Sequence, residues 1–232
     1  MQAKRGYIPK DDRYFSAESL STLRTASEHV CYLIDHGYDL KHASTFVGDH
    51  FQLSERQRIA IMRSVATKEQ LAMRSAKEVL IDQLRGKEVW IDGFNTIITL
   101  EVMLSESTLL SCMDGTIRDL AAMRGTYRIA RVTSEAIQFL FDVLQDARAN
   151  HATILLDQPV SNSGRLKALL ADLGENRPFS LDLRILNDVD RQLYGKECVI
   201  SSDSVVLDNC ASWVNLTRHC FELHGSQAFR VW

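Results

Sequence analysis

Three short apolar runs in this chain of 232 residues each end in an aspartate, at Asp92, Asp157 and Asp203. Each run is rich in branched side chains and is followed by turn-forming or helix-forming residues, which is the pattern of a buried parallel strand. Ligands of open α/β sheets bind just beyond the carboxyl ends of the strands, so we expect the three carboxylates to gather at one sheet edge. Carboxylates that lie close together repel one another, and a bound divalent cation usually offsets this repulsion. The pattern therefore predicts a metal-dependent site.

The first part of the chain shows only helical patterns. Apolar residues between Leu20 and Ile34 form one helical stripe, and Ser54 with Gln57 forms a capping-box pattern ahead of a further helix. We expect a longer helix at about 67–84, and the Arg-Gly-Lys sequence that follows it marks a boundary. The sequence therefore predicts an all-α module at residues 1–86.

Beyond this boundary, apolar runs alternate with helical patterns. The expected strands cover residues 88–92, 109–113, 153–157, 181–186, 198–202 and 213–216. This alternation predicts a mostly parallel, Rossmann-like α/β sheet with helices on both faces. We therefore expect an α/β domain at residues 87–232.

Composition narrows the class of protein. Apolar residues make up 45% and charged residues 25% of the chain, which is ordinary for a soluble globular protein. The five cysteines include no C-x-x-C pair, so a structural zinc site has no support. No run approaches the length of a membrane span and no apolar leader follows Met1, so we expect a cytoplasmic protein without a membrane partner. Because the net charge is −3, contact with nucleic acid must rely on local basic patches.

The strand-end aspartates suit one kind of chemistry. Mg²⁺ and Mn²⁺ prefer hard oxygen ligands, and either ion, held there, activates water and offsets charge on a leaving phosphate. The sequence therefore predicts phosphodiester hydrolysis. A structural alternative stays open at each position, because aspartates also cap helices and start turns. Asp203 would then cap a helix at 205–210, and Asp157 would start a turn before Pro159.

Two of these segments carry a resemblance to a known family. The sequence Ile91-Asp92-Gly93-Phe94-Asn95 resembles the opening motif of NYN-type nucleases in the PIN-like superfamily, where an Asp ends the first strand and Gly-x-Asn follows. The run 200–204, Ile-Ser-Ser-Asp-Ser, resembles the later strand of that group, which ends Ser-x-Asp. Residues 153–160 are similar to its intermediate strand, and Asp190 stands where such proteins often carry another acid. The resemblance covers about residues 85–232.

This resemblance implies a PIN-like fold and a ribonuclease that depends on Mg²⁺ or Mn²⁺. Asp92 and Asp203 would be metal ligands and catalytic residues, and Asn95 would orient a carboxylate or a water. Asp157 and Asp190 would be further acids at the same site.

One departure from the family pattern concerns the fourth acid. These proteins often have an Asp two residues after the Ser-x-Asp aspartate, whereas this chain has Val205 there. Asp208 lies about one helical turn later, and we expect it to be a replacement ligand. The departure keeps open a second hypothesis, a PIN-like fold without turnover that binds RNA or acts as a scaffold. A third hypothesis is a metal-dependent phosphatase that acts on small molecules.

The whole chain also resembles an uncharacterised prokaryotic family of paired domains of unknown function. Residues 32–38 and 48–53 carry the resemblance in the helical half. It implies the two-part architecture and no activity.

A basic stretch is the best candidate for contact with RNA. Arginine binds phosphate through two hydrogen bonds and stacks on bases, and aromatic rings stack likewise. The alternative is an ordinary solvated loop. The residues are Arg118, Arg124, Tyr127, Arg128 and Arg131. Residues 40–65, which include Arg63, have helix–turn–helix spacing, but such helical pairs are more often packing modules.

Two further features have structural interpretations. Glu101 is the single charge in an apolar helical stretch, so we expect a structural ion pair there. Residues 112–116, Cys-Met-Asp-Gly-Thr, resemble the signature of haloacid-dehalogenase phosphatases, but Cys112 replaces the nucleophilic aspartate. We therefore interpret this segment as a turn at Asp114 and Gly115.

Overall fold

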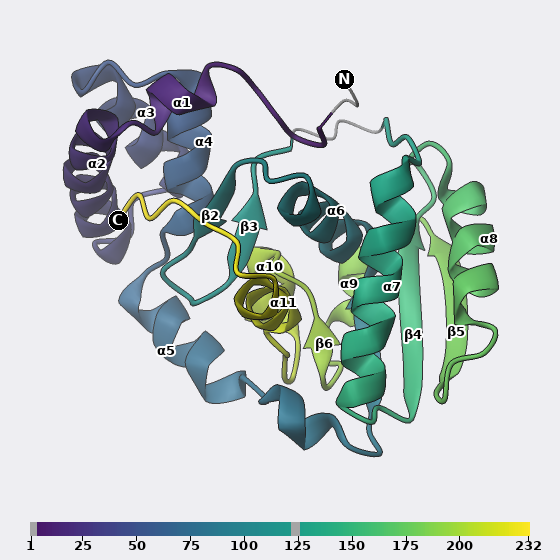
Figure 1. Ribbon diagram of the computed structural model, residues 1–232. Coiled ribbons are helices and arrows are strands. Elements are labelled where there is room, and N and C mark those ends of the chain that lie inside the picture. The colour runs from purple at the N-terminus through teal and green to yellow at the C-terminus, as the bar shows by residue number, and fades with distance from the viewer. Residues whose placement is uncertain (1–3, 122–125) are drawn as a thin grey trace.

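The computed structural model describes residues 4–121 and 126–232 (Figure 1). The helices of the first half are α1 (Asp11–Tyr14), α2 (Ala17–Asp35), α3 (Leu40–His50), α4 (Glu55–Ser64) and α5 (Lys68–Lys77), followed by a 3-10 turn at Ile81–Leu84. The predicted capping box is present, because Ser54 and Gln57 exchange side-chain and backbone hydrogen bonds at the start of α4. The helix expected at 67–84 is wrong in length. After Lys77 the chain becomes extended, since the amide of Val79 donates to the carbonyl of Trp213 at 2.8 Å.

The centre of the second half is a parallel sheet of four strands. They are β1 (Glu88–Asp92), β4 (His151–Asp157), β5 (Ser180–Leu186) and β6 (Val199–Ile200), in the order β5-β4-β1-β6. All three pairings are parallel, so β1 has β4 on one side and β6 on the other. This confirms the predicted mixed α/β fold with a parallel sheet.

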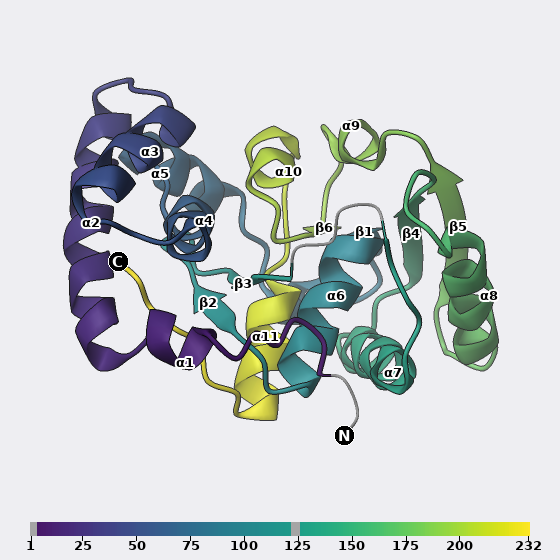
Figure 2. The same cartoon turned by 90° about the horizontal axis from the view of Figure 1, so that it is seen from above.

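Helices cover both faces of this sheet (Figures 1 and 2). They are α6 (Gly93–Leu104), α7 (Arg131–Asp146), α8 (Ser163–Gly174), α9 (Val189–Leu193), α10 (Ser204–Asn209) and α11 (Leu216–His224). The alternation of side chains along the strands sets the two faces apart. Ile91 and Ile154 lie in the main core with α6 and α7, whereas Leu155 and Val199 pack on the other face with α9 and α10. The prediction of helices on both faces is therefore confirmed.

A β-hairpin lies between the two halves. Its strands, β2 (Leu109–Ser111) and β3 (Ile117–Asp119), pair antiparallel and form a separate sheet. The segment between them is a turn, as expected, with Gly115 at a φ of +80°. Leu109 packs in the main core and Leu110 in the core of the helical half. The hairpin therefore joins the two cores.

The C-terminal segment differs from the expectation. Instead of a strand at 213–216, Trp213 forms isolated bridges to Glu78 and Val199, and α11 begins at Leu216. The chain then returns to the helical half, where the hydroxyl of Ser27 donates to the carbonyl of Val231 at 2.6 Å. The first strand, β1, begins just after the boundary predicted at residue 86, but the last residues of the chain pack with the helices before that boundary.

Among residues 4–121 and 126–232, no helix combines the length and the apolar character needed to cross a membrane.

Candidate functional site

The order of the strands brings the predicted acidic residues to one edge of the sheet. Asp92 and Asp157 end the neighbouring parallel strands β1 and β4, and Asp203 follows β6 on the other side of β1. Asp190 lies on α9, which packs against β1 and β4. We call Asp92, Asp157, Asp190 and Asp203 the acidic edge. Each of the other three raises the pKa of Asp92, so the four carboxylates share one electrostatic environment.

Asp92 is the most deeply placed of the four, with 5% of its surface exposed. Its carboxylate accepts a hydrogen bond from the hydroxyl of Ser201 at 2.9 Å. Burial, with the charges of Asp203, Asp190 and Asp157, raises the pKa of Asp92 to about 8. Within the described part of the chain, no basic side chain forms an ion pair with it. At neutral pH the group is therefore protonated unless a cation stabilises its charge.

Asn95 fixes the loop that carries Asp203. From the first turn of α6, its Oδ1 atom accepts hydrogen bonds from the Ser202 amide at 2.8 Å and the Ser202 hydroxyl at 2.9 Å. Asp203 itself caps α10, because its Oδ1 atom accepts from the Val205 amide at 2.8 Å and the Val206 amide at 3.3 Å. The structural interpretation of Asp203 as a helix cap is therefore confirmed, and the same residue stands at the acidic edge.

The outer part of the acidic edge is more open to solvent. Partial burial raises the pKa of Asp157, and the neighbouring charge of Asp188 adds to this effect. Asp190 is exposed on α9, and its pKa is raised by partial desolvation and by the charges of Asp203, Asp157 and Asp188. These shifts show that the outer carboxylates also lack compensating positive charge.

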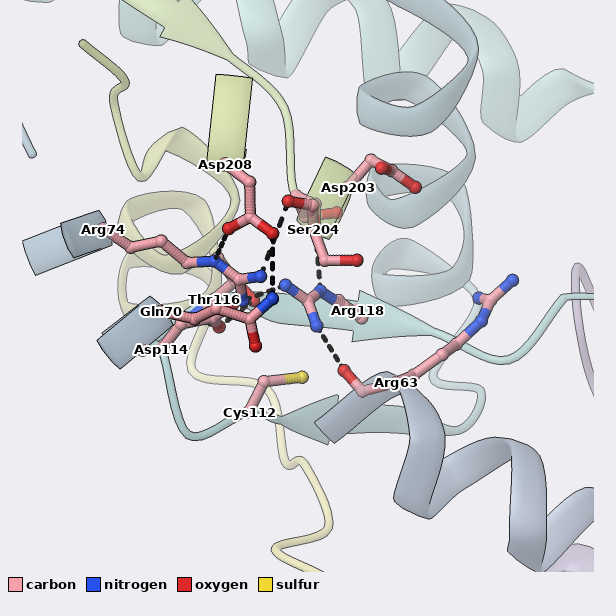
Figure 3. A network of polar contacts seen from close by, with 12 residues as sticks. Arg63, Gln70, Arg74, Cys112, Asp114, Thr116, Arg118, Asp203, Ser204 and Asp208 are labelled. Atoms are coloured by element: carbon pink, nitrogen blue, oxygen red, sulfur yellow. Dashed lines mark hydrogen bonds and ion pairs between the residues drawn. The ribbon is translucent and has the colours of Figure 1, made fainter. Parts of the chain in front are cut away.

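Asp208 does not reach the acidic edge, so its expected role as a replacement ligand is wrong. Its two carboxylate oxygens accept hydrogen bonds from Arg74 at 2.7 Å and Gln70 at 3.0 Å, both on α5 (Figure 3). Arg74 also pairs with Asp114 of the hairpin turn at 2.7 Å, and Asp114 pairs with Arg118. Arg74 therefore holds Asp208 toward the helical half. The same network of buried ion pairs connects α10 and the hairpin to α5.

The residues expected to bind RNA are not brought together. Arg118 is buried and bonded to Asp114, and Tyr127 is fully buried with its hydroxyl bonded to the Glu101 carboxylate at 2.8 Å. Tyr127 has no exposed surface for a nucleic acid, and the guanidinium of Arg118 is bonded within the protein. Arg128 is exposed, and exposed Arg131 pairs with Glu135 at 3.1 Å. Arg124 lies outside the described residues.

A pocket of about 220 Å³ adjoins the acidic edge and joins the two halves. Asn95 and Asp203 line it from the α/β half, and Arg63 lines it from α4 of the helical half. Arg118 forms part of its wall and donates from Nε to the Ser202 carbonyl at 2.6 Å. The position of Arg63 has no signal in the sequence, because it belongs to a different half of the chain from the strand-end aspartates. The role of Ser201 does have one, in the Ser-x-Asp motif.

Comparison with known proteins gives the family. The model described as "Domain of unknown function (DUF5616)" matches residues 81–219, and "Protein of unknown function (DUF434)" matches residues 22–77. An uncharacterised protein of Methanocaldococcus jannaschii is 31% identical over 188 residues, which cover 80% of this chain and 89% of that relative. No solved structure matches the chain. The paired-domain architecture expected from the sequence is thus confirmed, and the chain belongs to the DUF5616 family, with a DUF434 region preceding that domain.

Proposed function

We propose that this protein is a metal-dependent nuclease of PIN-like type that hydrolyses phosphodiester bonds in RNA. The observation that carries the proposal is the buried, acidic environment of the Asp92 carboxylate. A buried carboxylate with three acidic neighbours and no basic partner among the described residues is unfavourable by itself. A divalent cation bound at the acidic edge would offset the repulsion and the burial of this charge. Hydrolysis of a phosphodiester is a reaction that commonly depends on such an ion.

The donor set fits Mg²⁺ or Mn²⁺ in a particular way. Among the described residues, no three His, Cys, Asp or Glu side chains form a metal-binding group. Mg²⁺ does not require one, because it usually takes one or two carboxylates and completes its shell with water and substrate phosphate. Asp92 and Asp203 would hold the ion, with Asp157 and Asp190 on the outer side. The Oδ2 atom of Asp203 has no hydrogen bond to the described residues, so capping leaves one oxygen for this role.

The chain itself supplies positioning and charge. A bound Mg²⁺ or Mn²⁺ supplies activation of water and offsets charge on the leaving phosphate. Ser201 orients the carboxylate of Asp92 through its hydroxyl, and the same oxygen accepts from the Asp203 amide at 3.0 Å. Asn95 holds the Ser202 backbone. These bonds fix the two inner carboxylates relative to each other before any ligand arrives, as a preorganised site requires.

A cleavage assay tests the proposal. Purified protein is incubated with end-labelled single-stranded RNA in Mn²⁺, in Mg²⁺ and in EDTA. We expect cleavage in the metal-containing buffers alone, and a loss of about a hundredfold or more in Asp92→Asn and in Asp203→Asn. Asp172→Asn, at an exposed aspartate of α8, is the matched control and should cleave like the wild type. Equal cleavage by all four proteins would sink the assignment.

A second candidate function has its own supporting observation. Val205 stands where the resembled family often has an acid, and Asp208 is tied to Arg74. These two features favour a PIN-like module that binds RNA, or acts as a scaffold, without turnover. Calorimetric titration with Mn²⁺ separates the candidates, because a silent titration combined with RNA binding favours the non-catalytic module. A panel of small phosphate esters tests the third hypothesis, a phosphatase.

We also propose that the protein acts in the cytoplasm. All five cysteines are free thiols, and four of them are buried. Unpaired cysteines are the normal state of a chain in a reducing compartment.

A further inference from the structure

We propose that Arg63 of the helical half binds a phosphate of the RNA strand in the pocket beside Asp203. This inference rests on the proposed function and deepens it, because it assigns a substrate-binding role to a residue outside the α/β half. It also gives the helical half a purpose: α4 completes a site whose acids come from the sheet.

The position of Arg63 supports this role. The pocket of about 220 Å³ has Arg63 on the side of α4 and Asn95 with Asp203 on the side of the sheet. Figure 3 shows the Arg63 side chain pointing away from the buried network of Arg74 and Asp208. A ligand in this pocket would therefore touch Arg63 and the acidic edge together.

The hydrogen bonds of Arg63 leave part of its guanidinium available. The side chain is 41% exposed, and its Nη1 atom donates to the backbone carbonyl of Asp119 at 2.5 Å. The Asp119 carboxylate is 3.6 Å away, and it already accepts from the Thr99 hydroxyl at 3.0 Å and the Ala121 amide at 2.7 Å. A guanidinium has five N–H donors. The Nε and Nη2 atoms of Arg63 make no hydrogen bond to residues 4–121 or 126–232.

Arg118 cannot take this role, although it lines the same pocket. Its Nε atom donates to the Ser202 carbonyl at 2.6 Å, its Nη2 atom to Asp114 at 2.5 Å and its Nη1 atom to the Arg63 carbonyl. Each of the three nitrogens of Arg118 therefore has a hydrogen-bond partner. The same bonds hold the backbone of Arg63 and the loop before Asp203 against the Arg118 side chain. Arg118 is thus a positioning residue, and Arg63 is the cation that faces the ligand.

The rest of the pocket suits a phosphate with its sugar. The Nδ2 donor of Asn95 has no partner within the described residues, while Oδ1 is fully used by Ser201 and Ser202. Met62 and Ile98 supply an apolar wall. At about 220 Å³ the pocket is smaller than those that enclose drug-sized ligands, so it accepts part of a nucleotide rather than a whole one. Arginine is the residue best shaped to bind phosphate through two bonds.

Binding in the absence of metal tests the inference independently of cleavage. The probe is a fluorescein-labelled oligouridylate, titrated by anisotropy in EDTA against the Asp92→Asn protein, in which a neutral carboxamide replaces the buried carboxyl and the proposed turnover is blocked. In this background, we expect Arg63→Gln to raise the dissociation constant about tenfold. The dissociation constant of Arg63→Lys should lie between those of the Asp92→Asn parent and Arg63→Gln, because lysine keeps the charge and loses the planar guanidinium. The control is Arg85→Gln, at an exposed arginine that precedes β1 at the opposite end of the strand, with less than a twofold change expected.

The outcomes separate this inference from the proposed hydrolysis. If Arg63→Gln weakens binding while the wild type does not cleave RNA in Mn²⁺ or Mg²⁺, the inference stands and the hydrolysis fails. If the wild type shows Asp92-dependent cleavage but Arg63→Gln binds RNA like Arg85→Gln in the Asp92→Asn background, the hydrolysis stands and the inference is overturned. Absence of binding by the Asp92→Asn parent also overturns it. Thermal melting verifies that each variant is folded, and Arg63→Lys carries the test if Arg63→Gln is not.

Discussion

Arg74 and Asp114 form an ion pair of 2.7 Å in which the two side chains are 2% and 1% exposed. Arg74 comes from α5 of the helical half and Asp114 from the hairpin turn, so the pair connects two segments that are 40 residues apart in sequence. Burial by itself would raise the pKa of Asp114, but Arg118, the Thr116 hydroxyl and Arg74 together lower it below its ordinary value. The pair therefore stays charged inside the protein and holds the wall of the candidate site.

We expect Asp114→Asn to lower the free energy of unfolding by about 3 kcal/mol or more, because it leaves buried Arg74 and Arg118 without this anion. Urea denaturation followed by circular dichroism measures the change. The matched control is Asp142→Asn, whose carboxylate is 60% exposed and pairs with Arg177 on the surface. Exposed pairs contribute about 1 kcal/mol or less, so the control should change little. Equal losses in both variants would show that the buried pair adds nothing special.

The pKa of Asp92 sets a pH dependence of stability. It is raised from 3.8 to about 8, so between these values the folded protein holds a proton that the unfolded chain has released. The free energy of unfolding should therefore fall as the pH rises through this window, by about 6 kcal/mol at most, and level off above it. Asp92→Asn has no proton to lose and should show a flatter profile, with a stability gain over the wild type that grows toward pH 9. Melting temperatures measured from about pH 5 to about pH 9 test this sign. A wild-type profile parallel to that of Asp92→Asn would contradict it.

Divalent metal should reverse this effect in the wild type. A cation at the acidic edge favours the ionised form of Asp92, so Mn²⁺ binding releases a proton and stabilises the folded state. At pH 8 we expect added Mn²⁺ to raise the melting temperature of the wild type and to leave that of an Asp92→Asn, Asp203→Asn double variant unchanged. EDTA should return the wild-type value to its starting point. Equal shifts in the two proteins would place the metal elsewhere.

The acidic edge was predictable because its information is local and repeated. Each apolar run identifies a parallel strand, and parallel strands must end at the same edge, so Asp92, Asp157 and Asp203 converge without knowledge of the strand order. The same reasoning gave the sheet and its helices. The sequence alone does not decide whether each carboxylate caps a helix or binds a cation. In the structure, Asp203 caps α10.

What was not predictable depends on contacts between distant segments. Asp208 is directed away from the acidic edge by Arg74, which lies 134 residues earlier in the sequence. Trp213 was expected in a strand because its neighbours are apolar, but its indole donates to the Arg74 carbonyl at 2.8 Å and only single bridges form there. Tyr127 was expected on the surface among arginines, whereas its hydroxyl meets buried Glu101. A linear sequence contains no local signal for any of these three placements.

Glu101 is fully buried, and Arg5 approaches its Oε2 atom at 2.9 Å, which confirms the expected structural ion pair. Burial raises the pKa of Glu101, while the Thr133 hydroxyl and Arg5 oppose that rise. We expect Arg5→Met to lower the free energy of unfolding by about 3 kcal/mol, since the carboxylate then lacks its cation. Adding Glu101→Gln to that variant should restore part of the loss, because the remaining group is neutral. A double-mutant cycle measured in urea gives the coupling, and additive losses would contradict it.

Gly93 follows Asp92 and starts α6, where the helix presses against β4. A Cβ atom at this position would lie 2.6 Å from Cδ2 of Leu156 and 2.7 Å from the backbone carbonyl of Leu155. The side chain could move, but the carbonyl belongs to a paired central strand. Gly93→Ala should therefore push α6 away from the sheet and cost about 1–3 kcal/mol of stability, with Asp92 displaced as a result.

A second glycine makes this prediction specific to the close approach. Gly164 also lies in the first turn of a helix, α8, and no atom stands within 4 Å of a Cβ built there. Gly164→Ala should stabilise the protein by about 0.5 kcal/mol, because alanine loses less backbone entropy in a helix. Urea denaturation of both variants, together with Mn²⁺ titration, tests the pair of predictions. Opposite signs in stability, with weakened Mn²⁺ binding in Gly93→Ala alone, are the expected result. A Gly93→Ala protein as stable as Gly164→Ala would mean that α6 does not need this contact to hold Asp92 at the end of β1.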